Sequence, residues 1–249
     1  MARKISLLMV MLMVVMMIAP AAQAQDETFS LTILHTNDVH GAYGPYNAAA
    51  DATTDGGAAR QMTVVNQIRA EGGNVLLLDA GDRFTGTLFH QQWRGEDSAR
   101  IMNAMGYDAM TVGNHEFDDG DEALVSFTDS LNFPLLTANV TFGADLAEKI
   151  QPYAVLEVAG EQIGVVGLTP PDTGILSSPG EDVVFNEDMA GAVQSYVDEL
   201  TEQGINKIIL MSHIGQGADE TIVAQVSGVD IIIGGHSHTL LSLSLIHIS

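Results

Sequence analysis

Short, continuously apolar runs alternate with segments of helical periodicity along most of this chain, and this alternation constrains its fold most strongly. Buried strands are predicted at residues 29–36, 75–79, 109–112, 134–138, 207–211 and 229–233. Helices are predicted at residues 58–70, 98–105, 122–131, 188–203 and 219–226. Apolar strands separated by helices indicate sheets that are covered on both faces. A predicted hairpin at 153–168 adds antiparallel pairing, so we expect an α/β fold with mixed sheets.

The first 24 residues have the pattern of a secretory signal. Arg3 and Lys4 precede an apolar run from Ile5 to Ile18, and Ala22-Gln23-Ala24 provides a small-residue cleavage pattern. A membrane anchor is the alternative, but the run is shorter than the roughly 20 apolar residues that a span needs. We therefore expect residues 1–24 to be removed and the mature protein to be secreted, in the periplasm or outside the cell, without a stable membrane span.

Metal-capable side chains follow five of the predicted strands, each time just beyond the carboxyl end. The seven residues are Asp38, His40, Asp82, Asn114, His213, His236 and His238. In open α/β sheets this edge is where ligands bind. Taken singly, a lone histidine is often a polar residue at a strand end and a lone aspartate often caps a loop, whereas the pair in His236-Ser237-His238 is a stronger indication. The repetition of such residues at one edge predicts a shared metal site.

The ligand types indicate which metals such a site would hold. The chain has no cysteine, so thiolate ligands and disulfides are excluded. Seven nitrogen and oxygen ligands exceed the needs of one tetrahedral ion, and they suit two divalent ions that share a bridging carboxylate. Mixed N/O ligation is compatible with Mn, Zn, Fe, Co or Ni and does not choose among them. A pair of ions of this kind activates water and stabilises an in-line displacement at phosphorus.

His115 and Asp118 form a second predicted feature beside the metals. His115 adjoins Asn114, and Asp118 is close enough in sequence to orient the imidazole ring. A histidine held in this way could stabilise developing charge or protonate a leaving oxygen. The alternative for Asp118 is membership of the acidic run that would start the next helix. His35 is interpreted as a hydrogen-bonded core residue, and His90 and His247 have no supporting context.

The charge balance bears on partners. The net charge is −23, and loss of Arg3 and Lys4 would take it to −25. A surface this acidic argues against nucleic acid or an anionic membrane as a partner. An anionic small molecule would need bound cations to approach the site. Arg83, beside Asp82, is one of the few cations; a phosphate contact is the less favoured interpretation of it.

The motifs LHTNDVHG, GDRFTG, GNHEFDDG, SHIG and GGHSHT resemble the calcineurin-like metallophosphoesterase superfamily, and their wording is most similar to its secreted 5′-nucleotidase family. The resemblance implies a four-layer α/β/β/α sandwich and hydrolysis of nucleotide phosphate monoesters by a metal-bound hydroxide. It also implies individual roles. Asp38, His40 and His238 would hold one ion, Asn114, His213 and His236 the other, and Asp82 would bridge them, with His115 and Asp118 as the catalytic dyad.

The end of the chain departs from this family pattern. Residues 242–249 do not resemble the family, so we expect an incomplete metallophosphoesterase domain at 28–241, with C-terminal strands missing and a non-matching tail. Three alternatives stay open on the same residues. The ester could be a 2′,3′-cyclic nucleotide or a UDP-sugar, the site could be that of a thiosulfohydrolase, or the chain could be an inactive metal-binding fragment. The sequence does not specify the oligomeric state.

Overall fold

The computed structural model describes residues 28–45 and 56–240, and the elements named below belong to a compact unit that begins at Leu31. The predicted signal, the tail at 242–249 and His247 lie outside the described residues. None of the described helices is long and apolar enough to cross a membrane.

The first sheet has five strands, and every neighbouring pair in it is parallel. Its order is β1 (Leu31–Thr36), β2 (Asn74–Asp79), β3 (Ala109–Thr111), β4 (Leu135–Leu136) and β6 (Ile150–Gln151). Because all five strands run in one direction, their carboxyl ends meet at one edge.

The second sheet has four strands and contains the predicted hairpin. Its order is β11 (Ile231–Gly234), β10 (Ile208–Ser212), β8 (Glu161–Leu168) and β7 (Tyr153–Val158). Only β7 and β8 pair antiparallel; the other neighbours are parallel. A two-stranded ribbon joins β5 (Val140–Thr141) to β9 (Val184–Phe185). The expected α/β class with mixed pairing is confirmed, and among the described strands antiparallel pairing is confined to the hairpin and this ribbon.

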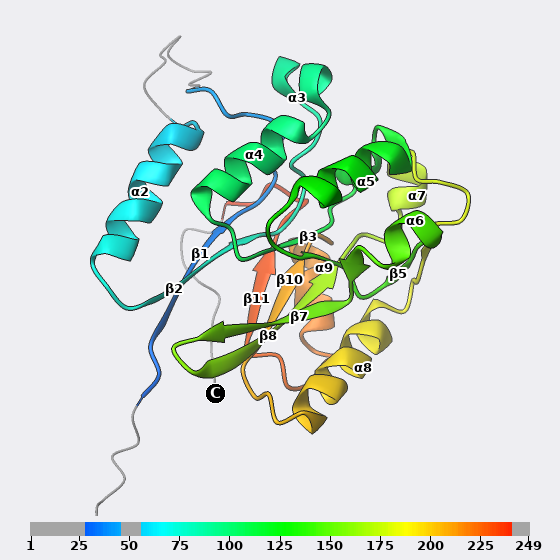
Figure 1. The fold of residues 1–249 in the computed structure, drawn as a ribbon. Helices are drawn as coiled ribbons and strands as arrows, with labels where there is room; N and C mark the ends of the chain where they lie inside the picture. The colour runs from blue at the N-terminus through cyan, green and yellow to red at the C-terminus, as the bar shows by residue number, and fades with distance from the viewer. Residues whose placement is uncertain (1–27, 46–55, 241–249) are drawn as a thin grey trace, which may run out of the picture. The chain divides into compact units, whose positions relative to one another are not determined.

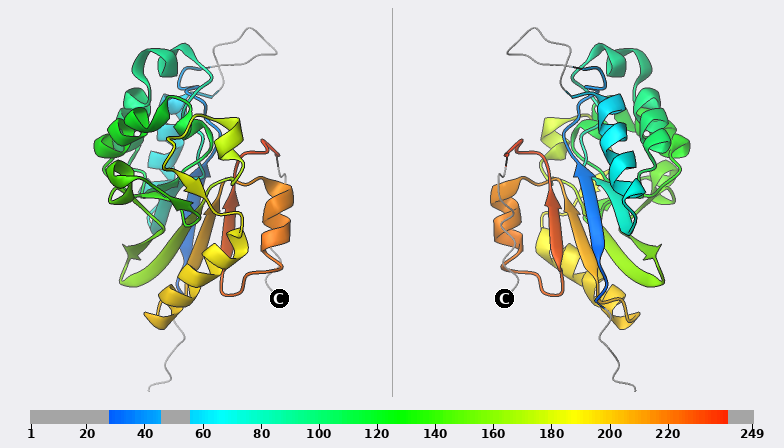
Figure 2. Two further views of the ribbon diagram at one scale, coloured as in Figure 1. Left: turned by 90° about the vertical axis from the view of Figure 1, so that its right-hand side faces the viewer. Right: turned by 90° about the vertical axis from the view of Figure 1, so that its left-hand side faces the viewer.

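Helices lie on the outer faces of the two sheets, so the layers follow the order helix, sheet, sheet, helix (Figures 1 and 2). The helices are α2 (Ala58–Ala70), α3 (Leu88–Trp93), α4 (Glu96–Met105), η1 (His115–Phe117), α5 (Gly120–Ser130), α6 (Ala144–Ala147), α7 (Thr173–Leu176), α8 (Met189–Glu202) and α9 (Gln216–Ile222). One core packs Leu77 of β2 against Met102 of α4 and Leu124 of α5. The other packs Leu210 of β10 against Val197 of α8.

The two sheets approach each other closely near their carboxyl ends. Gly167 of β8 permits this, because a Cβ there would lie 2.4 Å from the carbonyl oxygen of Leu136. The hydroxyl of Thr111 donates to the Leu136 carbonyl at 3.0 Å and accepts from Leu168 N–H at 3.0 Å. The amide of Ala138 donates to the Gly167 carbonyl at 2.8 Å. These bonds bring the loops after β1, β2 and β3 next to the loops after β10 and β11.

The first strand differs from its prediction. β1 is the edge strand of its sheet, and Thr32 and His35 are exposed. The prediction of a buried strand with His35 in the core is therefore wrong, because an edge strand in this position is covered on fewer sides than its central neighbours. The short helices α3, η1, α6 and α7 and the short strands β5, β6 and β9 had no predicted counterpart.

Candidate metal centre

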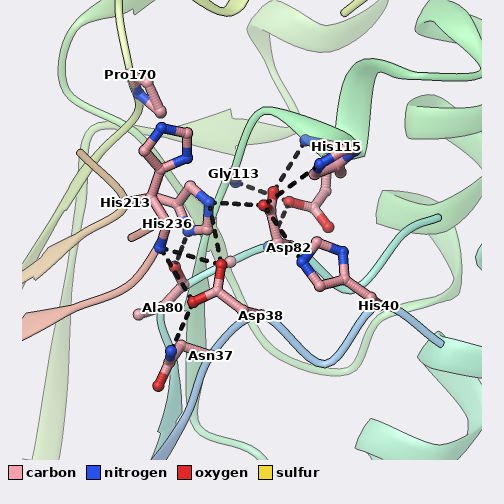
Figure 3. Close-up of polar contacts among 12 residues, drawn as sticks. Asn37, Asp38, His40, Ala80, Asp82, Gly113, His115, Pro170, His213 and His236 are labelled. Atoms are coloured by element: carbon pink, nitrogen blue, oxygen red, sulfur yellow. Dashed lines mark hydrogen bonds and ion pairs between the residues drawn. The ribbon is translucent and has the colours of Figure 1, made fainter. Parts of the chain in front are cut away.

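The seven predicted ligands lie on five loops at the common edge of the two sheets. Asp38 and His40 follow β1, Asp82 follows β2, Asn114 follows β3, His213 follows β10, and His236 and His238 follow β11. In Figure 3 the side chains of Asp38, Asp82, His213 and His40 converge on one small volume. The structure therefore brings together residues that are up to 200 positions apart (38 and 238).

The ligand atoms form overlapping groups that could hold metal ions. In each group the potential ligand atoms lie within 4.8 Å of one another: Asp38 with His40 and His238, His40 with Asp82 and His115, and Asp82 with His213 and His236. In the first group, His238 Nε2 lies 3.2 Å from His40 Nε2 and 3.3 Å from Asp38 Oδ1.

Asp82 lies between the other carboxylate and imidazole groups. Its Oδ2 is 2.9 Å from His213 Nε2 and 3.9 Å from His40 Nε2. Its side chain is 2% exposed, whereas that of His238 is 60% exposed. Asp82 is thus a buried carboxylate that lies near a histidine from each sheet, His40 and His213. This is the geometry that a bridging ligand requires.

Hydrogen bonds hold the rings of two predicted metal ligands, His213 and His40, in fixed orientations. His213 Nδ1–H donates to the carbonyl of Ala80 at 2.5 Å, and His40 Nδ1–H donates to the carbonyl of Phe84 at 3.2 Å. These bonds fix the tautomer and leave Nε2 to face the site, as is usual for ligating histidines. Within the described part of the chain, buried Asn114 Oδ1 and His213 Nε2 have no partner with hydrogen-bond geometry. Such buried polar atoms need an explanation, and a divalent cation supplies one.

The backbone of the site is unusual. Eight non-glycine residues of the described chain have positive φ, and five of them are predicted ligands: Asp38 (50°), His40 (48°), Asp82 (61°), His236 (73°) and His238 (50°). Non-glycine residues rarely adopt this region, and such strain concentrates at functional sites. His236 and His238 are two positions apart on the loop that follows β11. Their left-handed conformation directs the two rings to different groups.

Glu116 is a functional residue that the sequence analysis missed. Its carboxylate is fully buried and accepts from the backbone N–H groups of Asp82 (3.0 Å), Arg83 (2.7 Å), Phe84 (3.2 Å) and Gly113 (2.7 Å). Burial, followed by the charge of Asp82, raises the pKa of Glu116 to about 7. Glu116 thus fixes the strained backbone that presents Asp82. Its only sequence signal is an acidic residue directly after His115.

Gly113 allows the loop after β3 to approach Asp82 closely. A Cβ at this position would lie 2.2 Å from Asp82 Oδ1, which is too close for any side chain. The same Oδ1 accepts from the backbone N–H of His115 at 2.9 Å. The glycine therefore lets the loop that carries Asn114 and His115 pack directly on the central carboxylate.

The predicted dyad is assembled. His115 Nδ1 lies 2.6 Å from Asp118 Oδ2, and its Nε2 lies 4.0 Å from Asp82 Oδ2. The hydrogen bond to Asp118 raises the pKa of His115. Burial alone would raise the pKa of Asp118, but hydrogen bonds from His115, Ser177 and Thr85 lower it to about 2. His115 therefore presents Nε2 toward the metal-binding residues while a charged carboxylate holds Nδ1.

The field of the carboxylates favours positive charge at this edge. Burial lowers the pKa of His213, but the nearby carboxylate of Asp82 outweighs burial and raises it to about 9. Since a buried histidine normally loses its proton, this reversal shows how strongly the neighbouring carboxylates stabilise a cation.

Arg83 and His90 are both buried and each pairs with an aspartate. Arg83 is fully buried, and its guanidinium pairs with Asp79 at 2.5 Å, so it does not reach toward a phosphate at the sheet edge. His90, which had no sequence context, is also buried and pairs with Asp119 at 2.8 Å.

Comparison with known proteins is consistent with this geometry. The family described as calcineurin-like phosphoesterase matches residues 31–240. The chain is 44% identical over 232 residues to a 5′-nucleotidase of Bos taurus, an alignment that covers 89% of this chain and 40% of that protein.

Two solved structures resemble it closely. A 5′-nucleotidase precursor from Thermus thermophilus has a TM-score of 0.82 at 40% identity, over 87% of this chain and 43% of that one. The NAD nucleotidase of Haemophilus influenzae has a TM-score of 0.77 at 37% identity, over 84% and 39% of the two chains. The chain thus spans about 40% of the length of the relatives it matches.

Proposed function

This chain belongs to the calcineurin-like phosphoesterase family, and on that premise we propose that it is the metal-binding part of a secreted hydrolase that cleaves phosphate monoesters of nucleotides. The observation that carries the proposal is the position of Asp82. This one buried carboxylate lies near His40 and His213, which are on loops of different sheets. The arrangement suits a pair of divalent ions and not a single one.

Two of the overlapping groups support a division of the proposed ligands between two ions. Asp38, His40 and His238 would hold one divalent ion, and Asn114, His213 and His236 the other, with Asp82 shared. The carboxylate, imidazole and amide donors fit Mn, Zn, Fe, Co or Ni. When bound, two such ions supply Lewis acidity at the phosphoryl oxygens and lower the pKa of a nucleophilic water.

The protein's own groups would carry out the proton transfer. His115 Nε2 faces the side on which Asp82 lies. Asp118 accepts a hydrogen bond from Nδ1–H and thereby fixes the orientation of the ring. The hydrogen bond to Asp118 raises the pKa of His115 and so favours its imidazolium form, which can donate to the oxygen of the departing alcohol. Glu116 would hold the loop of Asp82 in place during this step.

Nucleotides are the proposed substrate class because relatives at 40% and 44% identity are named 5′-nucleotidases. A second candidate is a nucleotide with a phosphoanhydride bond, since the 37% identical Haemophilus influenzae structure is an NAD nucleotidase. A sulfate thiohydrolase, SoxB, shares the fold at 23% identity, and that likeness concerns the fold alone. Secretion is proposed from the signal pattern of residues 1–24.

Metal removal tests the proposed function. We expect the purified chain loaded with Mn²⁺ or Zn²⁺ to release phosphate from AMP and from 4-nitrophenyl phosphate. Exhaustive chelation should abolish release from both substrates, and the same metal should restore it, because the site needs cations to bind an anionic ester. The measurement is inorganic phosphate release with metal content determined on the same sample. Release that persists in a metal-free sample, or none from a folded sample with two ions bound, would contradict the proposal.

A further inference from the structure

A second histidine–aspartate pair lies next to the dyad. His90 of α3 places Nε2 2.8 Å from Asp119 Oδ2, and Asp119 directly follows Asp118. His90 is only 5% exposed, and its ring packs on Phe84 at 4.7 Å between centroids. His90 Nδ1 is buried without a partner among the described residues, so the proton belongs on Nε2, where it is donated to Asp119.

The side chain of Asp119 bonds to His90 and does not cap its own helix, α5. It occupies the N-cap position of α5, where an aspartate commonly accepts a hydrogen bond from the first turn of the helix. Its side chain makes no such capping bond. The carboxylate instead reaches α3, which lies 29 positions earlier in the chain. The pair therefore ties the start of α5 to α3 rather than stabilising α5 itself.

The segment around α3 contacts two loops of the site, the one that carries His40 and the one that carries Asp118. The Thr85 hydroxyl donates to Asp118 Oδ2, the oxygen that also accepts from His115. The Thr87 hydroxyl donates at 2.6 Å to the carbonyl of Gly41, next to the predicted ligand His40. Residues 85–90 thus lie between the first metal-binding loop and the loop that carries the dyad.

Helix α3 has little apolar burial to keep it in place. Its outer side chains Leu88, Phe89 and Trp93 are 78%, 48% and 47% exposed. Among the described residues, Phe89 packs edge-on against Tyr43, and the inner side of α3 is held by the Thr87 bond and the His90 contacts with Phe84 and Asp119. Loss of the His90–Asp119 pair would therefore free both α3 and the residue that follows Asp118.

We propose that His90 and Asp119 are positioning residues for the His115–Asp118 dyad. By anchoring Asp119 to α3, the pair keeps the Asp118 carboxylate where one oxygen can serve both His115 and Thr85. The orientation of the His115 ring, and hence proton delivery to the leaving oxygen, depends on this anchor. The inference rests on the proposed function in that His115 acts on a departing ester oxygen.

The test uses substitutions that separate packing from hydrogen bonding. His90→Phe keeps a ring against Phe84 and removes the Nε2–H donor. His90→Gln restores an N–H donor near the same place. Asp119→Ala removes the acceptor at a partly exposed position, so it tolerates truncation better than a core residue. His35→Phe, at an exposed position on the edge strand, is the matched control.

Kinetics and NMR report on the dyad independently. We expect His90→Phe and Asp119→Ala each to lower kcat for AMP about 10-fold, with little change in KM or metal content, because small misplacements of a catalytic group are costly. Hydrolysis of 4-nitrophenyl phosphate should change less, since nitrophenolate departs without full protonation. The downfield proton signal of His115 Nδ1–H should broaden in both variants and persist in His90→Gln and His35→Phe.

The double variant decides whether the two residues act as one unit. We expect His90→Phe/Asp119→Ala to lose no more activity than either single variant. A loss of about 100-fold, the product of the single effects, would overturn the proposal, as would equal losses with both substrates. If the wild-type chain releases no phosphate, the proposed function fails, yet the His115 signal still tests the pair: its persistence in His90→Phe would overturn the positioning role.

Discussion

Replacing Asp82 by asparagine is expected to lower phosphate release at least about 1000-fold and to reduce the metal content of the protein. Asp82 is the only carboxylate in the described structure that belongs to two of the three potential metal-binding groups. An amide of the same size keeps the packing against Gly113 but removes the charge that two cations would share, so both ions lose a ligand. The measurements are metal content after gel filtration and phosphate release from AMP.

Asp145→Asn is the matched control for this substitution. Asp145 is exposed on α6, and the same chemical change there should leave both quantities unchanged. Circular dichroism separates loss of metal from loss of fold. A folded Asp82→Asn protein that keeps two ions and near-normal activity would contradict the bridging role.

Removing the imidazole of His115 is expected to have the second-largest effect. His115→Ala should lower kcat for AMP by about 100- to 10,000-fold, the usual range for a lost general acid. The loss should be smaller with 4-nitrophenyl phosphate, because its leaving group needs less help from a proton. Metal content should stay at the wild-type value, since the substitution removes none of the seven proposed ligands and leaves two of the three potential metal-binding groups intact.

The alternative role for His115 is metal ligation, because its ring nitrogen also lies within reach of His40 and Asp82. In that case His115→Ala would lower metal content and would affect both substrates alike. His35→Ala, on an exposed histidine of β1, controls for the substitution itself. An unaltered rate with AMP would exclude His115 from the chemical step.

The regular core of the fold was predictable from the sequence. Residues 58–70 form α2 with the predicted bounds, because their apolar spacing is helical and Gly72 and Gly73 follow after the C-cap residue Glu71. The helix predicted at 188–203 is α8, which Asp188 caps and Gly204 follows with φ 86°. In these segments local propensity, apolar spacing and capping residues all favour the same structure.

Helix α3 shows why other elements were missed. It has only 6 residues, too few to establish a helical apolar stripe, and its large apolar side chains Leu88, Phe89 and Trp93 face solvent and not a core. The error on His35 has a related cause. An apolar, β-branched run predicts a strand, but it does not say whether that strand is central or at an edge.

The positions of the site residues followed from one rule, that ligands gather at the carboxyl ends of parallel strands. The structure places all seven predicted ligands on loops at that edge. The supporting residues could not be predicted in this way. Glu116 acts through four backbone N–H groups of segments that meet only after folding, and Ser177 reaches Asp118 from a distant loop. Such contacts depend on tertiary packing and have no local sequence pattern.

Crystals of the chain soaked in Mn²⁺ would test the central claim most directly, through anomalous difference density at the sheet edge. We predict two peaks about 3.5–4 Å apart, which is the usual spacing in two-metal hydrolases. Asp82 should lie between them, with Asp38, His40 and His238 around one peak and Asn114, His213 and His236 around the other. A single peak, or two peaks with Asp82 bound to only one, would contradict the account.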